Sequence, residues 1–89
     1  MELSIKLAGE VIQQERMRRK RSQEVLSGLA AMSRSHWSEI EHGRHPDLAL
    51  QTFWRIADAL DLRPSELMRL IEDEMERSER ENEKKSGAK

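Results

Sequence analysis

Residues 22–43, which read SQEVLSGLAAMSRSHWSEIEHG, carry the signals for two short helices joined by a tight turn. Ser22 and Ser33 are predicted N-caps, because a serine hydroxyl can accept a hydrogen bond from a free amide of the first helical turn. Gly43 is placed where a glycine commonly follows the last helical residue. Apolar residues recur at helical spacing in both segments. We therefore predict one helix from Ser22 to about Ala31 and another from Arg34 to His42.

The rest of the chain predicts three further helices, so that the fold class is all-α. We expect a helix from about Ser4 to Lys20, another from about Leu48 to Leu60, and a last one that begins at Pro64. In the fourth helix, a core-facing stripe has spacings of three, four and three: Leu50, Phe53, Ala57 and Leu60. Phe53 and Trp54 are adjacent, so only one of them can point fully inward.

The length of 89 residues is typical of one small domain, and zero cysteines exclude a disulfide framework. No stretch has the apolar length of a membrane span, and the N-terminus does not resemble a signal peptide. We therefore expect a cytoplasmic protein that does not enter a membrane. Residues 1–75 are predicted to form the folded domain, and residues 76–89 a charged, solvated C-terminal tail.

Although the net charge is only −1, basic and acidic residues are unevenly distributed along the chain. Residues 16–46 contain seven Arg and Lys against three Glu, whereas residues 71–89 contain five against seven. The basic run RMRRKR at residues 16–21 either contacts phosphate groups or forms a solvated helix end. A basic front half is typical of a nucleic-acid-binding protein.

Polar side chains lie on the predicted third helix opposite Trp37 and Ile40. A short helix that presents such side chains can enter the DNA major groove, which is roughly 12 Å wide. The segment resembles the lambda repressor and Cro type of helix-turn-helix, the XRE family, over roughly residues 7–70. The resemblance is carried by SQE at 22–24, SRS at 33–35, SEIEHG at 38–43, IADAL at 56–60 and SEL at 65–67.

This resemblance implies a five-helix lambda-repressor-like domain that binds double-stranded DNA. It assigns base contacts to Arg34, Ser35 and Glu39, with Ser38 nearby. It assigns phosphate contacts to four further residues: Gln23, Ser33, His42 and Arg44. Arg16 and Glu41 match a pair that forms an internal salt bridge. The chemistry of these side chains is consistent with base contacts, because an arginine can donate hydrogen bonds to guanine and a glutamate can accept one from cytosine. Glu39 could instead be a solvated acid.

Three departures from the family pattern affect the expected geometry. Ala31 replaces the usual turn glycine, so that the turn is expected to be slightly remodelled. Lys20 and Arg21 replace a glycine and an apolar residue, and Trp37 replaces a smaller aliphatic residue. Trp37 is expected to lie in the core.

The sequence predicts a homodimer that forms through the C-terminal helices. So small a domain is not expected to cover every residue of the apolar stripe on its last helix, Leu67, Met68, Leu70, Ile71 and Met75, and Trp54 is a second candidate for the contact. A symmetric dimer implies a pseudo-palindromic operator. The three histidines, without cysteines, do not favour a metal site, and no cofactor is expected.

We therefore expect a sequence-specific transcriptional regulator that reads its operator through the third helix. The alternative is an antitoxin-like or bridging protein-interaction module in which DNA binding is secondary. An enzyme is not expected, because no constellation of residues suited to catalysis is present.

Overall fold

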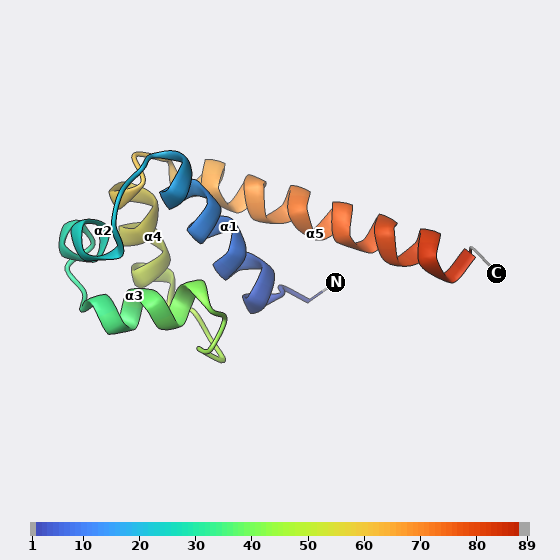
Figure 1. Ribbon diagram of the computed structural model, residues 1–89, viewed down its shortest axis with the longest axis horizontal. Coiled ribbons are helices and arrows are strands. Elements are labelled where there is room, and N and C mark those ends of the chain that lie inside the picture. The colour runs from blue at the N-terminus through green and yellow to red at the C-terminus, as the bar shows by residue number, and fades with distance from the viewer. Residues whose placement is uncertain (1, 88–89) are drawn as a thin grey trace.

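The computed structural model describes residues 2–87, and the side chains of residues 2–83. The described residues form five helices and no strand: α1 (Ile5–Arg18), α2 (Gln23–Leu29), α3 (Arg34–Glu41), α4 (Leu50–Ala59) and α5 (Pro64–Gly87). Helices α1 and α4 pack against the first part of α5, α2 and α3 lie on the far side of these two, and the rest of α5 extends beyond all four (Figure 1). The predicted all-α class and the order of the five helices are confirmed.

Local signals in the sequence explain where the helices begin. The hydroxyl groups of Ser4, Ser22 and Ser33 each accept a hydrogen bond from the backbone amide three residues later, at 3.1 Å. At the start of α5, the Arg63 amide donates to the carboxylate of Glu66 at 2.9 Å, as in a capping box. The predicted caps at Ser22 and Ser33 are therefore confirmed.

The first four helices all end in the same way, although only one of them has a glycine there. A residue in the left-handed conformation follows each C-cap: Lys20 (φ 53°), Ala31 (φ 55°), Gly43 (φ 66°) and Asp61 (φ 58°). At α2, the Met32 amide donates to the Ser27 carbonyl and the Ala31 amide to the Gly28 carbonyl, which is the Schellman pattern. The expected change of the turn at Ala31 is therefore not observed, because alanine adopts the conformation that glycine would take.

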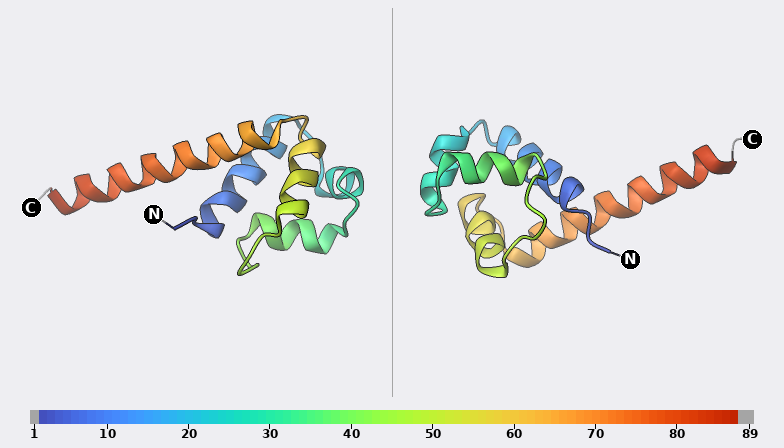
Figure 2. Two further views of the ribbon diagram at one scale, coloured as in Figure 1. Left: turned by 180° about the vertical axis from the view of Figure 1, so that it is seen from behind. Right: turned by 90° about the horizontal axis from the view of Figure 1, so that it is seen from below.

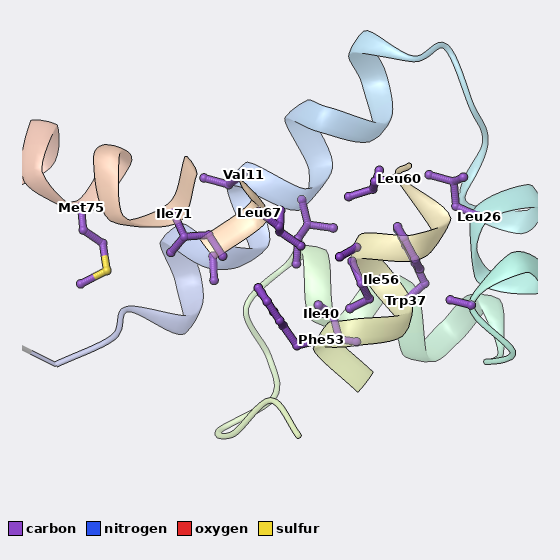
Figure 3. Close-up of a cluster of buried hydrophobic side chains, with 14 residues drawn as sticks. Val11, Leu26, Trp37, Ile40, Phe53, Ile56, Leu60, Leu67, Ile71 and Met75 are labelled. Atoms are coloured by element: carbon purple, nitrogen blue, oxygen red, sulfur yellow. The ribbon is translucent and has the colours of Figure 1, made fainter. Parts of the chain in front are cut away.

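All five helices contribute buried side chains to the core, which Figure 3 shows. Trp37 is fully buried there, as predicted. Phe53 is buried and Trp54 is 53% exposed, which agrees with the expectation that only one of the two points inward. Leu50 was expected in the core stripe but is 76% exposed. It is the first residue of α4, and its side chain therefore lies beyond the region that the neighbouring helices cover.

The apolar stripe of α5 is covered more completely than the sequence predicts. Leu67, Ile71 and Met75 are buried within the single chain, and Met68 and Leu70 are partly buried. Helix α1 packs along this part of α5 and supplies buried residues such as Val11. The single chain therefore leaves only Met68 and Leu70 of this stripe partly uncovered, and a second subunit is not needed to bury Leu67, Ile71 and Met75.

Candidate DNA-binding surface

Helix α3 lies at the surface with one face in the core and the other open. Trp37, Ile40 and Glu41 are buried, whereas Arg34 and Glu39 are exposed. In the view from below, no other helix passes over α3 (Figure 2, right). Its outer face is therefore free to contact another molecule.

Most of the predicted contact residues line one shallow depression beside α3. Six of the eight do so: Gln23, Arg34, Ser35, Ser38, Glu39 and Arg44. They come from the start of α2, from α3 and from the loop after α3. Residues that are distant in the sequence thus form one polar surface, which we call the reading surface.

Ser33 and His42 lie outside the lining of this depression. The Ser33 hydroxyl caps α3 by accepting from the His36 amide. One ring nitrogen of His42, Nδ1, lies 2.7 Å from the Ser38 carbonyl oxygen. Both residues remain exposed, at the two ends of α3.

The carboxylate of Glu41 joins α1, α2 and α3 from beneath the reading surface. Arg16 donates to it through Nε at 2.6 Å and through Nη2 at 3.1 Å. Gln23 donates through Nε2 at 2.9 Å, and the indole N–H of Trp37 donates as well. The Arg16–Glu41 pair that the resemblance implied is therefore present, and two further donors join it.

The protonation of Glu41 reflects these donors. Burial alone would raise the pKa of Glu41, but hydrogen bonds from Arg16, Gln23 and Trp37, together with the charge of Arg16, hold this pKa below its ordinary value. Glu41 thus stays ionised at neutral pH. A buried carboxylate of this kind depends on all its donors, because an unpaired buried charge is costly.

Sequence reasoning missed the hydrogen bond from Trp37 and the role of Gly9. Trp37 was expected to act only by packing, but its ring also satisfies the buried carboxylate one turn later. Gly9 lies where α1 crosses α3, and a Cβ atom there would be 2.3 Å from the Ile40 carbonyl oxygen. The spacing of Trp37 and Glu41, four residues apart, was a signal for the first contact.

The basic run at residues 16–21 is only partly available for a ligand. Arg16 is engaged by Glu41, while Arg18 and Arg19 pair with Glu15 at 3.0 Å each. Lys20 and Arg21 are exposed. About half of the residues in this run therefore form ion pairs within the protein and are not free to bind a ligand.

Two other properties of the described residues bear on the expected partners. None of the helices within residues 2–87 combines the length and the apolar character that a membrane crossing requires. In the same residues, no group of three His, Cys, Asp or Glu side chains is placed to hold a metal ion.

Comparisons with known proteins agree with this geometry. The helix-turn-helix domain family matches residues 7–70. The restriction-modification controller protein C.AhdI from Aeromonas hydrophila is 30% identical, and the match covers 71% of this chain and 94% of that one, with a TM-score of 0.67. No curated protein matches the chain.

Two more distant structures share the fold. The clp gene regulator ClgR from Corynebacterium glutamicum has a TM-score of 0.79 at 15% identity, covering 96% of this chain and 90% of its own. The controller protein C.Esp1396I has a TM-score of 0.77 at 18% identity, covering 86% and 99%. The chain belongs to the helix-turn-helix domain family, in its lambda repressor and Cro (XRE) type, a family of DNA-binding transcription regulators.

Proposed function

We propose that a homodimer of this chain regulates transcription by reading a pseudo-palindromic operator, with α3 in the major groove of each half-site. The observation that carries this proposal is the reading surface, where residues from three segments line one polar depression. Its charges are mixed, because Arg34 and Arg44 lie beside Glu39. Such a surface suits base recognition better than uniform phosphate binding.

The side chains divide into two roles. Arg34 would donate two hydrogen bonds to a guanine, and Glu39 would accept from the amino group of a cytosine, with Ser35 and Ser38 completing the base contacts. The phosphate contacts would come from Gln23, Ser33, His42 and Arg44. The amide nitrogen of Gln23 uses one N–H for Glu41, which leaves the second N–H for a phosphate oxygen.

The dimer would form through α4 and the start of α5. Leu50 and Trp54 are four residues apart and largely exposed on α4. Trp54 borders a second depression, whose lining also includes two apolar and four charged residues: Leu62, Pro64, Asp58, Asp61, Arg63 and Glu66. Leu67, Ile71 and Met75 of the α5 stripe are already buried within the chain, so the surface on α4 is the better candidate for the self-association predicted for the C-terminal helices. A two-fold axis would set the two α3 helices about 34 Å apart, one turn of DNA.

Selection from a random duplex library tests the reading of DNA. We expect a palindromic sequence to be enriched, and its binding to weaken steeply with salt. Arg34→Ala should weaken binding by about 1–3 kcal/mol and relax the preference at one base pair per half-site. Arg80→Ala is the matched control, because it removes the same charge from the projecting part of α5.

Two results would contradict this assignment. If no sequence is enriched by the wild-type protein, sequence-specific reading is wrong. If Arg34→Ala weakens binding equally on all sequences, Arg34 contacts phosphate rather than a base.

Sedimentation equilibrium tests the dimer. Trp54→Ser should shift the protein toward monomers, whereas Leu29→Ser, which alters a still more exposed apolar residue on α2, should leave the dimer intact. Dissociation by both variants, or by neither, would contradict an interface on α4.

A further inference from the structure

The loop between α3 and α4 brings a histidine against the reading surface. His45 comes from this loop, and its ring lies beside that of His36 on α3, with the two ring centroids 4.8 Å apart and the rings tilted by 53°. The other side of this contact is Glu39, whose Oε2 atom lies 3.3 Å from Nε2 of His45. His45 therefore bridges two residues of α3 that are nearly one turn apart.

The Nε2 atom of His45 is shielded from solvent, although the side chain as a whole is one-third exposed. It makes no hydrogen bond of good geometry, and the carboxylate of Glu39 is the acidic group within ion-pair distance. A shielded ring nitrogen without a hydrogen bond is costly, and attraction to the nearby Glu39 carboxylate offsets part of this cost. Glu39 in turn is half exposed and reaches into the depression.

We propose that His45 is a positioning residue that holds the carboxylate of Glu39 for base recognition and so sets the preference at the base pair that Glu39 reads. This inference rests on the proposed function, in which Glu39 contacts a base. His45 itself does not line the depression, and it acts through Glu39.

The chemistry gives a reason for such a partner. A free glutamate side chain loses rotamer freedom when it binds, and a carboxylate near phosphate groups is repelled. The N–H of His45, 3.3 Å from the carboxylate but not aligned in a hydrogen bond, attracts it electrostatically. This attraction favours one carboxylate position before DNA arrives and offsets part of the repulsion. Both the imidazolium and the neutral tautomer that carries its proton on Nε2 supply this donor. Packing against His36 restricts the His45 ring.

Base preference at each operator position, measured by library selection, tests the inference in a double-mutant cycle. Glu39→Ala should reduce the preference at one base pair per half-site by a factor of roughly 5 to 150, the worth of a good base contact. His45→Ala should reduce the same preference by roughly two- to tenfold and leave the other positions unchanged. In the Glu39→Ala background, His45→Ala should have no further effect.

Two further variants separate the N–H donor from the ring. His45→Phe keeps a ring against His36 but lacks the donor, so it should behave like His45→Ala. His45→Gln keeps an N–H donor and should restore most of the preference. Circular dichroism melts of each variant establish that the helices are intact, and the Phe and Gln variants decide the question if the alanine variant unfolds.

The results that overturn the inference differ from those that overturn the function. If His45→Ala weakens binding equally on all sequences, or acts equally with and without Glu39, then His45 contacts DNA directly and the inference is wrong while the function stands. If His45→Phe retains the wild-type preference, only packing matters and the inference is also wrong. If the wild-type protein enriches no sequence, the proposed function itself fails, and the inference with it.

Discussion

Replacing Gly9 with alanine places a methyl group where α1 and α3 are in backbone contact. The added Cβ would lie 2.3 Å from the Ile40 carbonyl oxygen and 2.7 Å from that of Glu41, whereas ordinary contacts begin near 3.4 Å. The two helices would have to separate by about 1 Å, which also pulls Arg16 away from Glu41. Overpacking typically costs about 1–3 kcal/mol, and the obstacle here is backbone that cannot rotate away. Alanine recovers about 1 kcal/mol of helix propensity. Because backbone cannot yield, the overpacking cost is taken at the upper end of its range, and we expect a net loss of roughly 2 kcal/mol of unfolding free energy.

Gly28→Ala is the matched control for this prediction. Gly28 lies in α2, and no atom lies within 4 Å of the place that an added methyl group would take, so the same change should stabilise the protein by about 1 kcal/mol. Urea denaturation followed by circular dichroism measures both variants, and their midpoints should move in opposite directions. Should Gly9→Ala stabilise the protein as much as Gly28→Ala does, the close approach of α1 and α3 is refuted.

The remaining predictions concern acid stability, the turn and the C-terminal part of α5. The pKa of Glu41 is lower in the folded state than its ordinary value of 4.5, so its contribution is present above pH 4.5 and is lost as the pH falls below this value. Glu41→Gln should therefore cost about 3–5 kcal/mol at pH 7 and flatten the acid side of the stability curve measured by urea titration; an unchanged acid slope would contradict this. Ala31→Gly should raise the unfolding free energy by about 0.5–1 kcal/mol, because glycine adopts a positive φ without strain, and a lower melting temperature would argue against the strained turn. Truncation after Met75 should leave DNA affinity unchanged in a binding titration, whereas loss of dimers would give residues 76–89 a role in assembly.

Helix starts and the buried tryptophan could be predicted because their causes are local. A serine before an apolar-periodic segment satisfies free amides wherever the helix lies in the fold, and Ser22 and Ser33 do so. Trp37 shares a helical face with Ile40, and this face is buried. The grouping of the reading surface also follows from the resemblance, although the roles of its residues stay predictions.

The close contacts between helices could not be predicted because they depend on how two backbones meet. Nothing in the sequence around Gly9 distinguishes it from Gly28, yet one lies against a carbonyl oxygen and the other faces open space. The same limit applies to His45, whose approach to Glu39 depends on the path of the loop that connects α3 to α4.

Apolar periodicity predicts which face of a helix is covered, but it does not show which element covers that face or how far along the helix the cover extends. On α5, the covering element is α1 of the same chain, so the stripe at Leu67 and Ile71 is not a signal for a partner. On α4, the periodic stripe includes Leu50, which no neighbouring helix buries. Because Leu50 is exposed beside Trp54, the outer face of α4 is a better candidate for a dimer contact than the apolar stripe of α5. In the proposed dimer, the spacing of the two α3 helices, and with it the length of the operator, would depend on how two α4 helices pack across the two-fold axis.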